Sequence, residues 1–197
     1  MGHVTLVTGG AKSGKSAFAE SLAEKYGGRL GYIATAQAMD PEMVERIRRH
    51  RERRGPQWQT FEEPLTPSRL IASSNLDVLL LDCLTVLITN IILQQALDWD
   101  WDAPQSPPSA ELRLPAEAVQ AEMAALADAA AGFPGRVIFV ANEVGFGIVP
   151  PAPLARFFRD CAGTASQYLA ARADAVYLVV AGLPLYLKQP EGSKWLP

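Results

Sequence analysis

The sequence has few of the residues that mark several large classes of protein. Only two of its 197 residues are cysteines, Cys83 and Cys161, and they lie far apart. This spacing indicates neither a disulfide framework nor a zinc site, and the expected alternative is two small buried thiols in a reducing compartment. No apolar run reaches the roughly 18 residues of a membrane span, and the N-terminus lacks a signal-peptide pattern. We therefore expect a cytoplasmic protein with no membrane span.

The chain also lacks an excess of basic residues. Eighteen lysines and arginines stand against 21 acidic residues, which gives a net charge of -3. Proteins that bind nucleic acid usually carry a basic surface, so no nucleic-acid partner is expected. Hydrophobic residues make up 49% of the chain and charged residues 20%, which is typical of a globular protein. This length and composition predict a single domain over residues 1–197.

Mostly apolar segments alternate with helical patterns along the chain. Near-continuous apolar runs are typical of parallel strands that are covered on both faces. The expected strands are residues 3–8, 29–36, 76–85, 136–145 and 174–182, with one more short strand after Leu183. The expected helices are residues 16–26, 41–53, 116–131 and 154–172. This order predicts an α/β fold, and the residues at 97–115, rich in proline, acid and tryptophan, are expected to form a surface excursion.

The strongest motif, "GGAKSGKS", follows the first predicted strand and precedes a predicted helix. Its residues Gly9, Gly10, Ala11, Lys12, Ser13, Gly14, Lys15 and Ser16 match the pattern G-x-x-x-x-G-K-[S/T]. Glycines let backbone N–H groups turn around a phosphate, and the helix N-terminus favours its negative charge. Lys15 can reach the terminal phosphates, and the Ser16 hydroxyl can hold Mg²⁺. The motif predicts a triphosphate-binding loop, although no N-K-x-D motif identifies guanine.

Polar residues at the ends of two other predicted strands are candidate partners of this loop. Asp82 follows four apolar residues in "VLLLD", where an unpaired charge is costly to bury. It is therefore a candidate Mg²⁺ ligand, with a structural aspartate bound to backbone donors as the alternative. Asn142 and Glu143 end another strand where open parallel sheets bind ligands, but polar residues at strand ends also form turns.

A histidine lies on the protein-facing stripe of the predicted helix 41–53. At 100° per residue, Met43, Ile47 and His50 fall on one side, and the arginines point mostly elsewhere. The residues alone leave three interpretations open. His50 could pack structurally, the helix could be a lid whose arginines bind phosphate, or the imidazole could attack phosphorus to form a phosphoramidate.

These segments together resemble the bifunctional adenosylcobinamide kinase / adenosylcobinamide-phosphate guanylyltransferase family of cobalamin synthesis. The resemblance covers most of the chain outside residues 97–115. It is carried by "TLVTGGAKSGKSAFAE", "YIATAQAMDPEMVERIRRHRERRGPQWQTFEEP", "LLLDCLTVLITN" and "VANEVGFGIVPPAPLARFFRDCAGTASQYLAARADAVYLVVAGLPLYLK". It implies a RecA-like P-loop NTPase fold, with a mostly parallel sheet flanked by helices, and a homotrimer.

The resemblance also implies two reactions and a set of site residues. A nucleoside triphosphate phosphorylates adenosylcobinamide, and GTP then transfers GMP to that phosphate through a guanylylated histidine, which corresponds to His50. GTP and ATP are the implied substrates, with Mg²⁺ held by Ser16 and Asp82. The implied nucleotide contacts are the loop 9–16, in which Lys15 is also catalytic, and Ala34, Thr35, Ala36, Arg51, Glu52, Arg53, Arg54, Glu62 and Asp82.

The chain departs from the family pattern at three positions. Lys12 stands where arginine is more common, Ser166 where asparagine is expected, and Asp82 where relatives often have glutamate. Two other functions remain open: a P-loop kinase for another small molecule without guanylyl transfer, and a RecA-like ATPase module acting on nucleic acid or protein. The net charge argues against the second. Whether ATP or GTP donates in the kinase step is left open.

Overall fold

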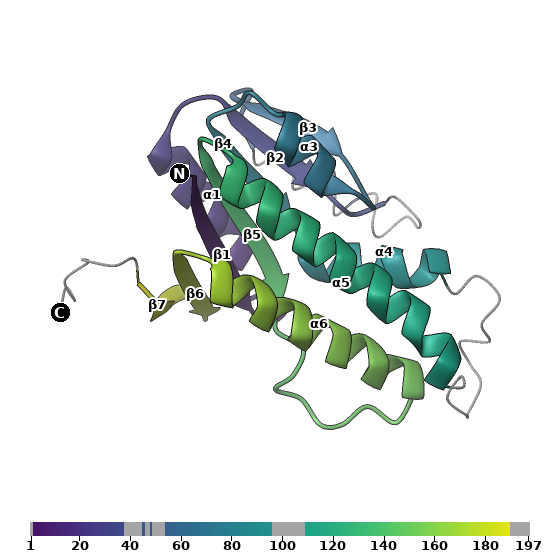
Figure 1. Cartoon of the computed structure of the whole chain (residues 1–197). Coiled ribbons are helices and arrows are strands. Elements are labelled where there is room, and N and C mark those ends of the chain that lie inside the picture. Colours follow the sequence, from purple (N-terminus) through teal and green to yellow (C-terminus); the bar gives the residue numbers. More distant parts are fainter. Residues whose placement is uncertain (1, 38–44, 46–47, 49–53, 96–108, 190–197) are drawn as a thin grey trace.

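Seven strands form one sheet at the centre of the computed structural model, which describes residues 2–37, 45, 48, 54–95 and 109–189 (Figure 1). The sheet order is β3-β2-β4-β5-β1-β6-β7, and every neighbouring pair is parallel except β6 and β7. The strands are β1 (His3–Gly9), β2 (Leu30–Ala34), β3 (Trp58–Glu62), β4 (Val78–Asp82), β5 (Arg136–Asn142), β6 (Ala175–Val180) and β7 (Leu183–Lys188). The predicted mostly parallel α/β sheet is thereby confirmed.

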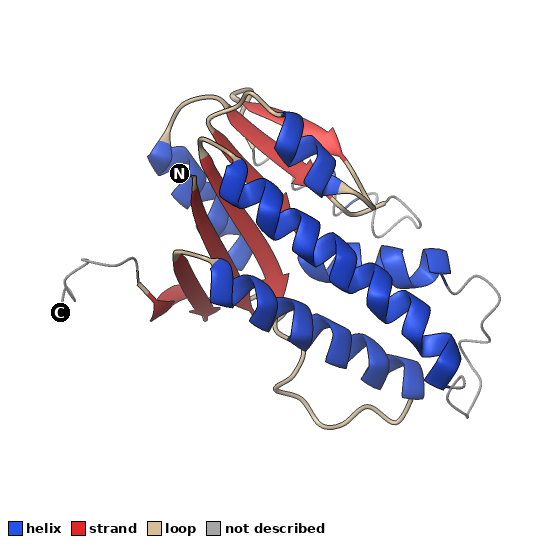
Figure 2. Cartoon of the chain, viewed as in Figure 1, coloured by secondary structure: helices blue, strands red, loops and turns tan. Residues whose placement is uncertain are grey.

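Helices cover both faces of the sheet (Figure 2). An apolar cluster fills the space between the sheet and the helices on each side. On one face, α1 (Lys15–Tyr26) packs through Ala19 and Ala23 on β1, β4, β5 and β6. The other face carries α3 (Pro67–Ser73), α4 (Leu84–Gln95), α5 (Ser109–Gly132) and α6 (Pro153–Arg172). α5 and α6 lie side by side there (Figure 1). No helix of the described residues is both long and apolar enough to cross a membrane.

The five predicted strands and the extra strand β7 are present, but three elements were not predicted. These are β3, α3 and α4. The prediction of strand up to Thr85 was wrong, because α4 begins at Leu84, and β5 ends at Asn142 rather than at residue 145. α5 begins at Ser109, so helix replaces the last part of the expected excursion. Residues 97–108 and most of the predicted helix 41–53 lie outside the described residues.

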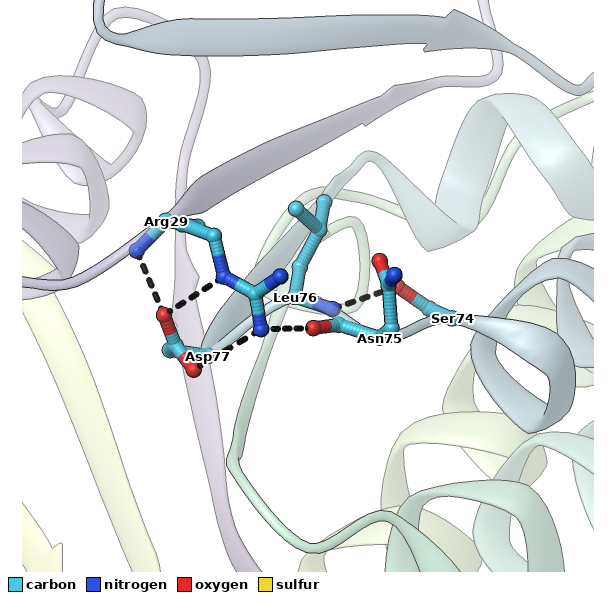
Figure 3. Close-up of polar contacts among 5 residues, drawn as sticks. All are labelled: Arg29, Ser74, Asn75, Leu76 and Asp77. Carbon is cyan, nitrogen blue, oxygen red and sulfur yellow. Dashed lines mark hydrogen bonds and ion pairs between the residues drawn. The ribbon is translucent and has the colours of Figure 1, made fainter.

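The amino ends of β2 and β4 are joined by a polar contact at the edge of the sheet (Figure 3). Asp77 Oδ2 accepts hydrogen bonds from the Arg29 backbone N at 2.7 Å and from Arg29 Nε at 3.1 Å. The Arg29 guanidinium also donates to the carbonyl of Asn75. Side-chain and backbone hydrogen bonds from Arg29 lower the pKa of Asp77. This contact joins the chain at the start of β2 to the chain at the start of β4, next to the first pair of their register, Leu30 with Val78.

Replacing Asp77 with Asn should lower the stability of the fold at neutral pH. Because the folded-state pKa of Asp77 is lowered, its contribution is complete above the unfolded-state value of about 3.9 and is lost as the pH falls through the folded-state pKa. Urea unfolding of the wild type and of Asp77→Asn should therefore converge in acid. Asp128→Asn, at an exposed carboxylate on α5, is the control. A difference that persists unchanged in acid would contradict this assignment.

Candidate nucleotide-binding site

The strand ends bring most of the described candidate residues to one edge and one face of the sheet. Ala34, the last residue of β2, pairs with Glu62 on β3 and with Asp82 on β4, and Gly9 pairs with Asn142. Side chains alternate between the two faces of a strand. Val7, Tyr32, Trp58, Leu80 and Val140 pack toward α1. The last residues of these strands lie two residues further along, or four in β3, and therefore share the α1 face.

The loop between β1 and α1 has little room for side chains. A Cβ atom on Gly9 would lie 2.5 Å from the carbonyl oxygen of Val179 and 2.6 Å from Ser13 Oγ. Gly14 has φ of 95°, and a Cβ there would lie 3.1 Å from the Cα of Gly182. The Gly182 backbone N donates to the Ser13 carbonyl at 2.8 Å. The turn between β6 and β7 thus supports the loop, and glycine is required at both positions.

The cationic side chain of the loop folds back over the backbone. Lys15 is buried, and its Nζ donates to the Gly10 carbonyl at 3.1 Å. Ser16, the second residue of α1, is half-buried beside it. Because Gly14 is the N-cap and has no side chain, the first N–H groups of α1 are available to a ligand. The Lys15 ammonium, the Ser16 hydroxyl and the N-terminus of α1 could therefore all bind a triphosphate here.

Asp82 ends β4 one strand away from the loop, since β5 lies between β4 and β1. Its Oδ2 accepts a hydrogen bond from the Tyr32 hydroxyl at 3.1 Å. Burial and the Asp82 charge together raise the pKa of Tyr32, which therefore stays a proton donor at neutral pH. Burial likewise raises the pKa of the neighbouring Cys83 thiol. Tyr32 was not among the predicted site residues.

The backbone after β2 is tied to the start of α4. Thr35 is fully buried, and its Oγ1 both donates to the Cys83 carbonyl and accepts from the Cys83 backbone N, each at 2.9 Å. Asn90 Nδ2 donates to the Thr35 carbonyl at 2.8 Å. The Thr35 side chain thus holds the backbone at the site edge. Ala34 and Ala36 flank it half-buried, and the side chain of Glu62 is exposed at the end of β3.

Arg54 does not lie at the strand ends with the other candidates. It lies between α1 and the sheet, where it contacts Glu20 and Tyr32. It is buried, and its guanidinium carbon lies 3.3 Å from the centre of the Tyr32 ring. Its Nη1 lies 3.9 Å from Glu20 Oε1, on a buried part of α1. His50, Arg51, Glu52 and Arg53 lie outside the described residues.

The two polar residues at the end of β5, Asn142 and Glu143, make hydrogen bonds that involve nearby backbone groups. Glu143 Oε1 accepts a hydrogen bond from the Gly145 backbone N at 2.6 Å, and the Glu143 backbone N donates to the Gly9 carbonyl at 2.9 Å. The Asn142 backbone N donates to Thr85 Oγ1 at 3.4 Å. These contacts favour the turn interpretation of Glu143 and connect β5 with the glycine loop.

A magnesium ion fits this donor set only together with a nucleotide. Within the described residues, no group of three or more His, Cys, Asp or Glu side chains is placed to hold a metal. Ser16 and Asp82 would supply one hydroxyl and one carboxylate, and phosphate and water oxygens would complete the octahedral shell that Mg²⁺ prefers. The chemistry of these donors suits the ion.

A glycine loop at the carboxyl end of β1, followed by α1 and separated by β5 from the carboxylate that ends β4, is the arrangement of a P-loop protein with a mostly parallel α/β sheet. The chain belongs to the cobinamide kinase / cobinamide phosphate guanyltransferase family, whose family model matches residues 5–187. The family predicted from the sequence is therefore confirmed.

Three curated relatives carry the name bifunctional adenosylcobalamin biosynthesis protein. The CobU protein of Escherichia coli K12 is 40% identical over 185 residues, which cover 93% of this chain and 98% of the relative. The CobP protein of Pseudomonas aeruginosa and the CobU protein of Salmonella typhimurium are each 42% identical over 93% of this chain, covering 96% and 98% of those proteins. Among solved structures, a KaiC-like protein of Pyrococcus horikoshii gives a TM-score of 0.43 at 13% identity, covering 89% of this chain and 70% of that one.

Replacing Gly9 with Ala should damage nucleotide binding without removing any ligand atom. The added methyl group would meet the Val179 carbonyl and Ser13 Oγ, so the loop must move. We expect GTP affinity, measured by calorimetry, to fall about tenfold or more, which is about 1.4 kcal/mol. Gly163→Ala, where the new methyl group meets nothing within 4 Å, is the matched control. Unchanged affinity in Gly9→Ala would show that the loop does not form the binding site.

Proposed function

We propose that this chain phosphorylates adenosylcobinamide with a nucleoside triphosphate and then transfers GMP from GTP to give adenosylcobinamide-GDP. Family membership over residues 5–187 supports both reactions. The glycine loop and Asp82, at one edge of the sheet and on the α1 face, supply the site that both reactions need. The substrates are the corrinoid, GTP and ATP, with Mg²⁺, and we keep the cytoplasm as the expected location.

In this proposal, the loop 9–16 holds the triphosphate for both steps. Backbone N–H groups and the α1 N-terminus bind phosphate oxygens, and Lys15 exchanges its bond to the Gly10 carbonyl for a phosphate oxygen. Thr35 keeps the backbone of residues 34–36 fixed beside Asp82, and Glu62 offers a carboxylate at the outer end of the same edge. A magnesium ion held by Ser16 and Asp82 would neutralise charge that develops on the phosphates.

The guanylyl transfer needs a nucleophile of the chain itself, and we propose His50. A neutral imidazole nitrogen attacks the α-phosphorus of GTP, a P–N bond forms, and the bond to pyrophosphate breaks. A phosphate oxygen of adenosylcobinamide phosphate then attacks the same phosphorus, the P–N bond breaks, and the imidazole is released. Arg51 and Arg53 are proposed to stabilise the charge on the phosphates, together with Lys15. In each step, one bond to phosphorus forms and one breaks.

Replacing His50 with Ala should abolish the covalent intermediate. With α-labelled GTP and Mg²⁺, the wild type should form an acid-labile adduct that mass spectrometry locates at residue 50, because phosphoramidates are unstable in acid. His50→Ala should form none and should still phosphorylate adenosylcobinamide. His3→Ala, at the start of β1 and away from the loop, is the control. An adduct that persists in His50→Ala would refute this nucleophile, and a wild type without adduct would favour the kinase that lacks guanylyl transfer.

We further propose that the protein assembles as a homotrimer, and that β7 lies in the interface. β7 is the last strand of the sheet, and all six of its residues are exposed. Leu185 pairs with Leu178, and Leu183 pairs with Val180, so their side chains share one face of the β6–β7 pair. The exposed apolar patch consists of Val180, Leu183, Leu185 and Leu187. Exposed apolar patches on edge strands are typical of association surfaces.

A charge placed in this patch should lower the molar mass in solution. Burying a lysine ammonium against apolar side chains is unfavourable, so Leu185→Lys should shift the trimer toward monomer. Light scattering after size-exclusion chromatography measures the mass. Leu114→Lys, at a leucine of similar exposure on α5, is the matched control and should leave the mass unchanged. A trimer that survives Leu185→Lys at low micromolar concentration would place the interface elsewhere.

A further inference from the structure

A row of side chains lies behind Asp82 on the α1 face of the sheet. The Tyr32 hydroxyl donates to Asp82 Oδ2 at 3.1 Å. The Arg54 guanidinium stacks on the face of the Tyr32 ring, with its central carbon 3.3 Å from the ring centre. Glu20 of α1 faces Arg54 across 3.9 Å. The row therefore connects the helix that carries Lys15 and Ser16 with the carboxylate at the end of β4.

The residues behind Asp82 are buried to an extent that is unusual for their types. Tyr32 is 4% exposed, Glu20 6% and Arg54 8%. Arg54 Nε and Nη1 make no hydrogen bond to the part of the chain that the structure describes. Buried ion pairs are often no more stable than apolar side chains of similar volume. Their presence here points to a requirement for position rather than for stability.

We propose that Tyr32 is a positioning residue for Asp82, and that Arg54 and Glu20 hold Tyr32 in place. The hydroxyl fixes the rotation of the carboxylate, the stacked guanidinium prevents the ring from turning away, and Glu20 balances the charge of Arg54. Residues that orient a metal ligand in this way commonly change metal affinity by 10- to 100-fold. This inference rests on the proposed function, because it takes Asp82 to be the carboxylate that holds Mg²⁺.

The positions of Ser16 and Asp82 explain why side chains would be needed to connect them. Ser16 lies on α1 and Asp82 ends β4. The helix packs on this strand through side chains, so no backbone pairing sets the position of one residue relative to the other. Glu20 lies one turn after Ser16 on α1, and Tyr32 lies on β2, the strand that pairs with β4. The row thus relates the two proposed magnesium ligands through side chains. Arg54 acts within it as a support, in place of the direct nucleotide contact that the family resemblance implies.

The test is the Mg²⁺ dependence of GTP binding in the full chain. Calorimetry without corrinoid, in a His50→Ala background, keeps GTP intact and measures its dissociation constant in chelator and at increasing free Mg²⁺. Mg²⁺ should increase the affinity for GTP in both proteins. For Tyr32→Phe we expect the free Mg²⁺ concentration that gives half of this increase to be about tenfold higher than for the protein with Tyr32. The dissociation constant in chelator should stay within about twofold, because a lost positioning contact affects only metal binding.

A second variant, Arg54→Lys, keeps the test decisive if Tyr32→Phe folds poorly. Arg54→Lys keeps the charge opposite Glu20 but loses the planar stacking on Tyr32, so it should also raise the Mg²⁺ requirement. If Arg54 contacted GTP directly, this variant would weaken binding in chelator as well, and the inference would be wrong. The matched control is Tyr168→Phe on α6, whose ring carries Arg172 at 3.6 Å in a similar stack away from the site. It should behave as wild type.

Asp82→Asn separates this inference from the proposed function on which it rests. If Asp82→Asn removes the gain from Mg²⁺ and Tyr32→Phe shifts it, both are supported. If Asp82→Asn removes the gain but neither Tyr32→Phe nor Arg54→Lys shifts it, the positioning role alone is overturned. If Asp82→Asn leaves the gain intact, Asp82 is not the magnesium ligand, and the inference falls with that part of the proposal.

Discussion

The parallel register of the sheet is the constraint on which the site depends. Parallel strands of matched length end at the same edge, and side chains two residues apart share a face. In this chain, β1 to β5 end at Gly9, Ala34, Glu62, Asp82 and Asn142, on the face that carries α1. A shift of one residue in the pairing of β2 and β4 would turn Asp82 toward α4. The bond between Arg29 and Asp77 at the opposite edge therefore matters for the site as well as for the fold.

The glycine loop depends on contacts with the backbone of other strands. Its position is set by the Val179 carbonyl, by the Gly182 N–H and by the backbone of Glu143, which bonds to Gly9. These groups come from β5, β6 and the turn after β6. Backbone atoms of a packed sheet move little, so the loop is held in the shape that we propose to bind phosphate before any ligand arrives. Lys15 Nζ already bonds to an oxygen acceptor within the loop, the Gly10 carbonyl.

The sequence alone predicted the elements whose signal is local and strong. β4, β5 and β6 contain near-continuous apolar runs, and the loop motif has fixed spacing. α4 was missed although Leu84, Leu87, Ile88, Ile91 and Ile92 repeat with helical spacing. The apolar run before it masked that period, and its β-branched residues favour strand on propensity. α3 was missed although Pro67 stands at its first position after Thr66, a typical helix start. β3 has only five residues, of which Trp58 alone is buried.

The candidate site residues also divide into those with a local sequence signal and those without one. Gly9 to Ser16 and Asp82 were predicted from motif spacing and from the position of a polar residue at a strand end. Ala34 and Glu62 were predicted only from the family resemblance. Tyr32 lies inside an apolar strand, "LGYIA", and reads as an ordinary core aromatic until its hydroxyl is seen on Asp82. Glu20 lies in a short amphipathic helix, where a glutamate usually faces water. Only the tertiary structure shows that it faces Arg54 from a buried position.

The burial of Glu20 and Arg54 shows how this fold divides stability and function between its two faces. The face under α3 to α6 is a large apolar cluster, and it supplies most of the driving force for folding. The α1 face has a smaller apolar cluster and contains the buried charges and the Tyr32 hydroxyl. A protein can tolerate poorly compensated charges only where the rest of its core is strong enough to hold them. The apolar face thus permits the polar one to keep side chains in the positions that the proposed nucleotide site would require.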